Sequence, residues 1–197
     1  MKMKHLGATA ALIIVATLAA CGGKAMFAVS CTISGLNNPG LVLENGSDTL
    51  SVPAGATTFT MPRQIAYGES FDVEVLTQPA HMTCSPVFGN NDSAGHTTAI
   101  NAEFTCAQNT YSLGGTINGL TGSGLVLING SQSTPLTVLT GATSFQFAAL
   151  VADGTPYGVT VFTQPTGQTC TVDKNATGIM GGSQVNNVVV DCVNNPT

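Results

Sequence analysis

The stretch Gly124-Leu-Val-Leu-Ile-Asn-Gly-Ser131 occurs earlier in the chain, with one change, as Gly40-Leu-Val-Leu-Glu-Asn-Gly-Ser47. Each copy is a short apolar run that ends in Asn-Gly, the strongest short hairpin signal, because both positions tolerate a positive φ. The chain after residue 20 shows no helical periodicity and consists of short alternating runs bounded by Gly, Asn, Pro and Asp. This pattern predicts an all-β sandwich or barrel.

Matches around this stretch show that the whole chain is duplicated. Cys31-Thr-Ile-Ser-Gly-Leu36 matches Gly115-Thr-Ile-Asn-Gly-Leu120 at an offset of 84 residues. Later matches, such as Val73–Pro79 with Val159–Pro165, stand at an offset of 86, which a two-residue insertion near residue 133 explains. Matches in one order across roughly 75 residues indicate an internal duplication.

The duplication divides the chain into predicted segments. We expect a signal peptide at 1–20, a tether at 21–27, one β-sandwich at 28–107 and a second at 108–197. About seven strands in about 80 residues fit an immunoglobulin-like sandwich, with a transthyretin-like sandwich as the alternative. The strands expected in the second sandwich are Tyr111–Ile117, Leu125–Ile128, Leu136–Leu139, Ser144–Ala148, Tyr157–Thr163, Thr169–Asp173 and Val185–Cys192.

Alternation along these strands assigns their faces. Val73 and Val75 share one face of their strand, while Asp72 and Glu74 mark the other face as the solvated one. The inward set expected in the second sandwich is Leu113, Ile117, Val126, Phe145, Val159, Val161, Val188 and Val190.

The chain begins with the basic segment Met1-Lys2-Met3-Lys4-His5 and continues with an apolar run over 6–20. A basic head before an apolar stretch shorter than a membrane span is typical of a secretory signal peptide. The run ends in Leu18-Ala19-Ala20-Cys21, which resembles the bacterial lipobox. The resemblance implies cleavage before Cys21 and lipid attachment to its thiol, with acyl chains that hold the product on a membrane. The residue after the cysteine is Gly22 and not Asp. In the sorting rule of enteric bacteria this resembles a signal for delivery to the outer membrane. An ordinary signal peptide with a chance cysteine is the alternative.

Charge is sparse, at 8% of residues against roughly 25% in ordinary globular proteins. From Cys21 onward three bases stand against ten acids, a net charge of −7. Nucleic-acid binding requires a basic surface, so nucleic acid is not an expected partner.

Four of the six cysteines form two equivalent pairs. Cys84 and Cys106, like Cys170 and Cys192, are 22 residues apart at matching places in the two copies. An exported compartment permits disulfides, and duplication of both partners predicts one bond within each sandwich.

Cys31 is then left over at the position that Gly115 has in the second copy. We interpret it as a buried free thiol that acts as a small apolar residue. Two alternatives are a bond between molecules and, if Cys21 carries no lipid, a bond between Cys21 and Cys31.

Two groups contain residue types that bind metals. His81, Met82 and Cys84 with His96 are the residue types of a blue-copper site, but the second copy lacks the first two. Asn90-Asn-Asp92-Ser93 offers one carboxylate, too few for calcium, and we expect a solvated hairpin loop there. No Ser/His/Asp or paired-carboxylate arrangement stands out in both copies, so we expect no metal, no cofactor and no catalytic residues.

The repeated motifs resemble a tandem β-sandwich repeat of exported lipoproteins and surface proteins of proteobacteria. The likeness lies in Tyr111–Leu120, Gly124–Gly130, Tyr157–Cys170 and Val185–Cys192, whereas the first copy departs from it at 64–70 and 85–99. It implies an extracytoplasmic module without catalytic residues.

Two functions follow as hypotheses. One is a structural or display spacer anchored at the cell envelope. The other is an adhesion-type module that binds an envelope protein or glycan through its loops.

The lipid hypothesis has a direct test. Cys21→Ala should abolish membrane association, because no later segment is apolar enough to hold the chain in a bilayer. Palmitate labelling followed by fractionation measures it, and a variant that still pellets with membranes would contradict the hypothesis.

Overall fold

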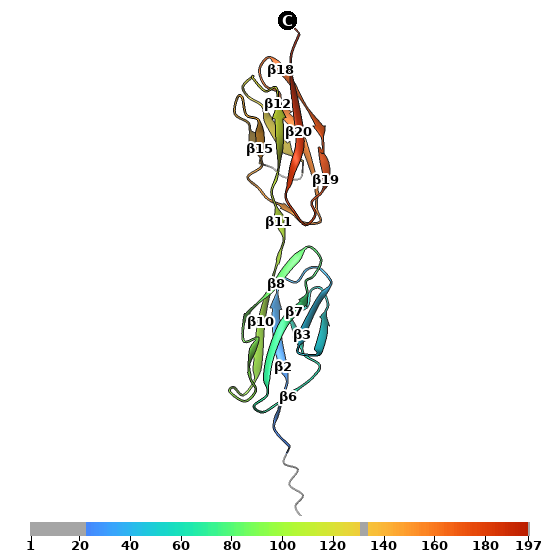
Figure 1. The fold of residues 1–197 in the computed structure, drawn as a ribbon, viewed down its shortest axis with the longest axis vertical. Coiled ribbons are helices and arrows are strands. Elements are labelled where there is room, and N and C mark those ends of the chain that lie inside the picture. The colour runs from blue at the N-terminus through green and yellow to red at the C-terminus, as the bar shows by residue number, and fades with distance from the viewer. Residues whose placement is uncertain (1–22, 131–133, 197) are drawn as a thin grey trace, which may run out of the picture.

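The computed structural model describes residues 23–130 and 134–196, and within these ranges the chain contains strands, turns and loops but no helix. Figure 1 shows two bodies placed end to end along the long axis. Unit one contains strands β1 to β10, and unit two contains strands β11 to β20. Each unit is thus one copy of the duplicated sequence.

Both units use the same succession of strands. Those of unit one are β1 (Met26–Phe27), β2 (Val29–Ser34), β3 (Leu41–Asn45), β4 (Asp48–Val52), β5 (Thr58–Thr60), β6 (Ile65–Ala66), β7 (Ser70–Thr77), β8 (Met82–Phe88), β9 (Asn91–Ser93) and β10 (Ile100–Gln108). Those of unit two are β11 (Thr110–Tyr111), β12 (Leu113–Asn118), β13 (Val126–Asn129), β14 (Leu136–Thr137), β15 (Ser144–Gln146), β16 (Val151–Ala152), β17 (Pro156–Thr163), β18 (Gln168–Lys174), β19 (Thr177–Ile179) and β20 (Val185–Asn194).

Each unit is a sandwich of two four-stranded sheets. In unit one the orders are β5-β2-β10-β8 and β4-β3-β7-β9, and unit two repeats them as β15-β12-β20-β18 and β14-β13-β17-β19. A two-stranded pair, β1 with β6 or β11 with β16, lies where the chain enters each unit. The predicted all-β architecture of two tandem immunoglobulin-like sandwiches is confirmed.

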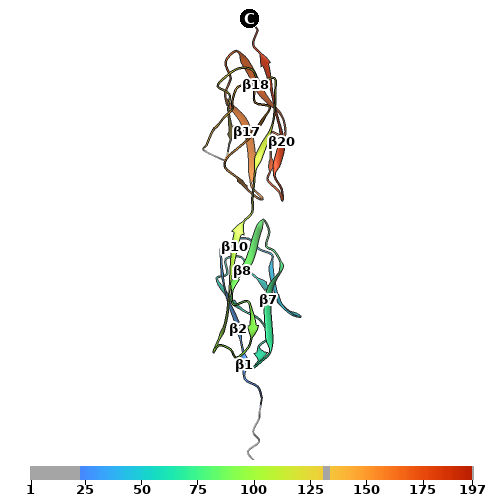
Figure 2. The same cartoon turned by 60° about the vertical axis from the view of Figure 1, so that its left-hand side comes forward.

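The first long strand of each unit runs parallel to its last. β2 pairs with β10 from Val29↔Ile100 to Ser34↔Thr105, and β12 pairs with β20 in the same way. Parallel strands start at the same end of a sheet, so the chain enters a unit at one end and leaves at the other. The two units therefore follow each other in line (Figure 1), and the turned view in Figure 2 shows the same narrow joint between them.

Each unit has its own core. The buried side chains of unit one come from residues 29–106 and those of unit two from residues 113–192. Seven of the eight side chains expected to point inward in unit two lie in or against its core, among them Leu113, Val159 and Val188, each at most 1% exposed. Alternating apolar residues therefore predicted the part of this core that lies on the longer strands, whereas buried residues such as Leu120, Phe147 and Met180 were not predicted.

Val126 is the exception, and the prediction for it was wrong. In β13 the inward position belongs to Leu127, which is fully buried and pairs with Val161, whereas Val126 is only half-buried. In the apolar run Leu-Val-Leu-Ile both alternating sets are apolar, so the pattern does not determine which set faces the core. A slip by one residue exchanges the two faces.

The asparagine of the hairpin motif has a role that differs from the expected one. In unit one the two-residue turn is Gly46-Ser47, since Asn45 pairs with Asp48 as the last residue of β3. The positive φ is at Gly46, and the buried Asn45 side chain instead accepts a hydrogen bond from the Asp72 backbone N–H at 3.0 Å. In unit two the Asn129 side chain accepts a hydrogen bond from the Gly158 backbone N–H at 2.8 Å. In both units the asparagine thus joins the hairpin to the next strand of its sheet.

Short strands were missed by the sequence analysis. Asn91–Ser93 is the strand β9, paired with β7, and not the hairpin loop that we expected. Its counterpart in unit two is β19, Thr177–Ile179, which was also overlooked. Three-residue edge strands with polar or glycine residues carry no alternating apolar signal, which explains the error.

The structure contains both expected disulfides, Cys84–Cys106 and Cys170–Cys192. Each joins directly opposite residues of neighbouring antiparallel strands. In the chain-entropy model, closing a loop of 22 residues stabilises the folded state by about 3 kcal/mol.

Cys31 is a free thiol and only 3% exposed. Burial raises the pKa of this thiol to about 11, although its hydrogen bond with the Ala102 backbone acts in the opposite direction. The equivalent Gly115 has no room for a side chain, because a Cβ there would overlap the Val188 carbonyl oxygen. In unit two a register shift between Leu113 and Gly115 brings β20 close to Gly115 and leaves no space for a side chain. In unit one the Cys31 side chain occupies the corresponding space.

Separate cores imply that unit two folds alone. Residues 108–197 should unfold in one cooperative transition when expressed in an oxidising compartment, and reduction of Cys170–Cys192 should move that transition to a much lower temperature. The reason is that about 3 kcal/mol is a large part of the roughly 5 kcal/mol that stabilises a small domain. Thermal unfolding followed by circular dichroism measures this, and an aggregated or molten product would contradict separate folding.

Candidate functional sites: the joint and a pocket in unit one

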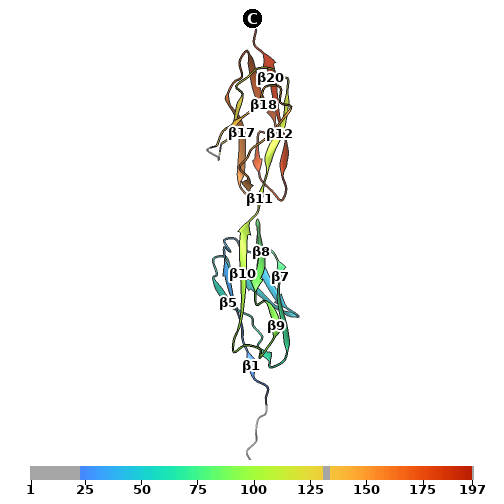
Figure 3. The same cartoon turned by 90° about the vertical axis from the view of Figure 1, so that its left-hand side faces the viewer.

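A single residue connects the two units. β10 ends at Gln108 and β11 begins at Thr110, with Asn109 between them. The Asn109 backbone N–H donates to the His81 carbonyl of unit one at 3.0 Å, and its own carbonyl accepts from the Asp153 N–H of unit two at 2.9 Å. The linker backbone is thus hydrogen-bonded to both units. Figure 3 shows the short passage of the chain from β10 to β11.

Side chains add further contacts at this joint. Gln108 Nε2 donates to the Asp153 carbonyl at 2.9 Å, and Thr83 Oγ1 donates to Asn109 Oδ1 at 2.7 Å. His81 Nδ1 lies 3.3 Å from Asp153 Oδ1. The Asp153 side chain is 8% exposed and also accepts from the Gly182 N–H at 3.1 Å. Since Asp153 is held within its own unit, the contact with His81 orients one unit on the other.

His81 has an unusual backbone conformation, with a φ of 61°. Left-handed φ is costly for residues that have a Cβ, and the equivalent residue of unit two is Gly167, with a φ of 73°. The His81 ring packs on Gly154, where an added Cβ would lie 3.0 Å from three ring atoms. A histidine at a position suited to glycine is explained by its contacts across the joint.

The backbone part of this joint recurs at the outer ends of the two units. At the end of unit two, the Asn195 N–H donates to the Gly167 carbonyl at 3.0 Å, and Thr169 Oγ1 donates to Asn195 Oδ1 at 2.7 Å. These two bonds match those that Asn109 makes with His81 and Thr83. The Tyr67 N–H donates to the Ala25 carbonyl at 2.8 Å, as Asp153 does to Asn109. The His81–Asp153 pair and the Gln108–Asp153 hydrogen bond have no counterpart at the outer ends among the described residues.

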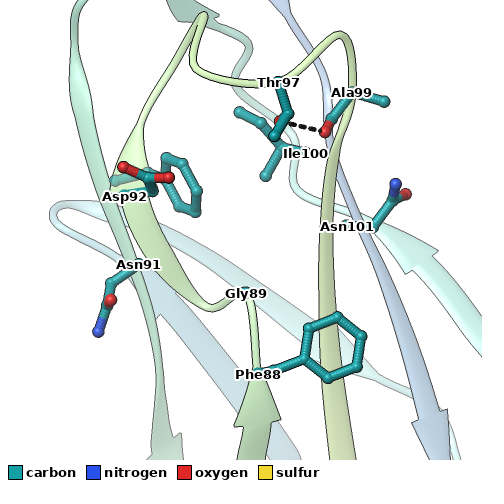
Figure 4. A pocket seen from close by; sticks show the side chains of 9 residues that line it. Phe88, Gly89, Asn91, Asp92, Thr97, Ala99, Ile100 and Asn101 are labelled. Atoms are coloured by element: carbon teal, nitrogen blue, oxygen red, sulfur yellow. Dashed lines mark hydrogen bonds between the residues drawn. The ribbon is translucent and has the colours of Figure 1, made fainter.

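Unit one has a pocket at the end of its sandwich (Figure 4). It has a volume of about 290 Å³, with Phe71, Phe88 and Ile100 as its apolar lining and Asp92 as its one charged group. Asp92 Oδ1 accepts from the Ser93 N–H at 2.7 Å and lies 2.8 Å from His96 Nδ1, and these two hydrogen bonds lower the pKa of the carboxyl group. The pocket suits an apolar group and contains no activated nucleophile among its lining residues.

The sequence pattern did not predict this pocket, although the sequence contains one signal for it. Six of the nine lining residues belong to the segment 85–99, where unit one departs from the repeat pattern of unit two. A stretch that differs between two copies of one scaffold is a candidate for a function specific to one copy.

The four residues with copper-binding chemistry are not brought together. His81 faces Asp153, Met82 is buried, Cys84 is bonded to Cys106, and His96 lies beside Asp92. Among the described residues no group of three or more His, Cys, Asp or Glu is placed to hold a metal ion.

Cys21, the predicted lipid attachment site, lies outside the described residues. Over 23–130 and 134–196 the chain has no helix that is long and apolar enough to cross a membrane.

Comparisons with known proteins leave the family open. No protein-family model matches the chain, and no curated protein matches it. Among solved structures it is similar to the Bacillus anthracis TIE protein, with 12% identity and a TM-score of 0.48 over 85% of this chain. It is also similar to the pilus adhesin SpaC of Lactobacillus rhamnosus GG, with 10% identity and a TM-score of 0.40 over 86% of this chain. The chain covers 34% and 31% of the lengths of these two structures.

The joint can be tested by giving unit one the residue found in unit two. His81→Gly should broaden the distance distribution between spin labels on the exposed Thr49 of unit one and Thr171 of unit two. It should change the free energy of unfolding by less than about 1 kcal/mol, because relief of left-handed strain offsets the greater unfolded-state entropy of glycine.

The matched control is Gly167→His, which places histidine where the described chain offers no partner unit. This variant should destabilise unit two by about 1 kcal/mol and leave the distance distribution unchanged. Pulsed electron spin resonance and thermal unfolding measure the two effects. Equal distributions in the wild type and His81→Gly would contradict an orienting role for the histidine.

Proposed function

We propose that the chain is a lipid-anchored spacer of the bacterial cell envelope, in which two β-sandwich units in line hold the C-terminal end away from the membrane. The observation that carries this proposal is the joint. A linker of one residue with hydrogen bonds to both units, supported by the His81–Asp153 contact, limits bending between the units. A spacer needs stiffness of this kind, and a flexible linker would not provide it.

The direction of the chain supports the same function. Parallel pairing of the first and last strands places the entry and exit of each unit at opposite ends. β10 has nine residues and β20 has ten. At roughly 3.3 Å per residue each unit is about 30 Å long. Two units in line then separate their outer ends by about 60 Å.

The anchor rests on the sequence motif that ends in Cys21. Acyl chains on that cysteine would place the tether at the membrane surface, with β1 five residues further on, at Met26. The two disulfides belong to a protein of an oxidising compartment, which fits an extracytoplasmic location. Gly22 after the cysteine supports the proposal of an outer-membrane location, on the periplasmic or the outer side.

The pocket in unit one favours a second candidate function, binding of a protein or glycan partner. An apolar lining with a single carboxylate fits an apolar group next to a positive charge better than it fits a sugar. A partner of this kind would be held by the end of unit one nearer the tether.

The spacer proposal predicts a difference in height above the membrane. In vesicles that carry an acceptor dye, the lipidated chain with a donor dye on Val193→Cys should show much weaker energy transfer than the chain labelled on Lys24→Cys. Native Cys31 is buried and its thiol has a raised pKa, so it should not take up the dye in the folded protein. Equal transfer from the two positions would show that the chain lies along the membrane and would contradict the spacer.

A further inference from the structure

The pocket of unit one lies where the chain crosses from one sheet to the other. β8 is an edge strand of the sheet β5-β2-β10-β8, and β9 is an edge strand of the sheet β4-β3-β7-β9. Figure 4 shows Asp92 of β9 on one side of the pocket and Asn101 of β10 on the other, with Phe88 at one end and Thr97 at the opposite end. The pocket thus occupies the open side of the sandwich between two edge strands.

Most of the pocket wall is apolar. Phe71 and Ile100 are 6% and 4% exposed and form its deep side, whereas Phe88 is 58% exposed at its rim. The volume of about 290 Å³ lies just below the range of roughly 300–1,000 Å³ that is typical of sites for drug-sized ligands. A space of this size suits one long side chain better than a whole ligand.

One carboxylate oxygen in the pocket has no partner in the protein. The hydrogen bonds with the Ser93 N–H and with His96 both involve Asp92 Oδ1, and Oδ2 bonds to no described residue. The Asp92 side chain is 49% exposed, and the lowered pKa of its carboxyl group keeps it ionised at neutral pH. His96 neutralises this charge only when it is protonated. The pocket therefore offers a negative charge with a free acceptor beside apolar walls.

The surroundings of the pocket are also acidic. Asp72 lies opposite Asn91, and Glu103 lies opposite Phe88 in the strand register. Among the described residues neither of these two acids forms an ion pair with a basic group. Residues 23–109 contain two bases and seven acids, a net charge of −5. A field of one sign attracts a cation and repels an anion.

Unit two has different residues at the equivalent positions. The last residue of β8 is Phe88 and that of β18 is Lys174, and the middle residue of β9 is Asp92 where β19 has Gly178. An added Cβ on Gly178 would lie 2.6 Å from the Tyr157 hydroxyl oxygen, so the tyrosine occupies that space. The same scaffold folds with a lysine and a glycine there. Phe88 and Asp92 are therefore not required by the fold, which makes them candidates for binding.

Two side-chain amides favour a polypeptide as the partner. Asn91 and Asn101 line the pocket, and neither side chain has a hydrogen bond within the described part of the chain. A side-chain amide offers both donors and an acceptor, which match the C=O and N–H of a peptide group. A simple amine has no carbonyl oxygen to accept from them.

We propose that this pocket binds a lysine or arginine side chain of a partner protein, with its methylene stem against Phe88 and Ile100 and its charged end at Asp92. Long basic side chains commonly bury an apolar stem while the charged head stays near water, as this open pocket allows. The inference rests on the second candidate function, partner binding by unit one, and is independent of the lipid anchor and of the spacer.

The test compares two peptides that differ in charge but not in shape. The isotope-labelled full chain with Cys21→Ser, which cannot be acylated, is titrated at pH 8 with acetyl-Ala-Arg-Ala-amide and with the same peptide containing citrulline, the uncharged isostere of arginine. At this pH an exposed histidine is mostly neutral, so His96 does not compete. The arginine peptide should shift the backbone amide resonances of Phe88, Asp92 and Asn101, with a dissociation constant in the low millimolar range. The citrulline peptide should bind about fivefold more weakly, the upper range for an ion pair at an exposed site.

Three variants separate the pocket from the general field of unit one. Asp92→Asn keeps an oxygen that accepts from the Ser93 N–H and should make the two peptides bind equally. Phe88→Lys introduces the residue of unit two and should abolish binding of the arginine peptide. The matched control Glu44→Gln removes one charge from β3, two strands away from β9, and should change the affinity less than about twofold because salt screens distant charges.

The outcomes distinguish this inference from partner binding as such. Equal binding of both peptides to the wild type would overturn the basic side chain as the occupant and leave partner binding in place. Failure of either peptide to shift the three resonances would overturn both. Weakening by Glu44→Gln as large as that by Asp92→Asn would show a diffuse attraction to unit one and would overturn the pocket as the site.

Discussion

The parallel pairing of the first and last long strands is the constraint on which the rest of this structure depends. β2 lies beside β10 and β12 beside β20, both in parallel register. Because the chain enters and leaves each unit at opposite ends, consecutive units can only follow in line. The joint, the length of the molecule and the separation of its outer ends all result from this pairing. Antiparallel first and last strands would bring both ends of a unit together and would fold the chain back on itself.

Duplication supplied two scaffolds of one design, and their surfaces then diverged. The cores, the disulfides and the buried Asn45 and Asn129 are common to both. A few differences lie in the core, such as Cys31 in unit one and Gly115 in unit two, but the differences in charge lie on the surface. Unit one has an acidic sheet and a pocket lined by Phe88 and Asp92, whereas unit two has an uncharged sheet. Residues that are the same in both units are those that the sandwich fold needs. Residues that differ between the units are candidates for a role of one unit.

The fold was more predictable than the candidate sites. Alternation and duplicated cysteines predicted strands, core and disulfides, because these depend on local periodicity and on one repeated spacing. The joint was not predictable, since His81 and Asp153 are 72 residues apart and only the geometry of two folded units brings them to 3.3 Å. The pocket depends in the same way on the end of a sandwich, where β8, β9 and β10 meet.

The sequence by itself determined the fold class, the duplication and part of the core, and its first residues carry the motif that predicts a lipid anchor. Each of these depends on neighbouring residues, on the alternation along a strand or on the constant spacing between the two copies. Tertiary structure alone decided that Leu127 and not Val126 faces the core, that Asn45 holds a neighbouring strand, and that His81 contacts unit two. The physical reason is that an apolar run or a polar side chain has several acceptable local environments. Only the packing of distant strands and units selects one of them.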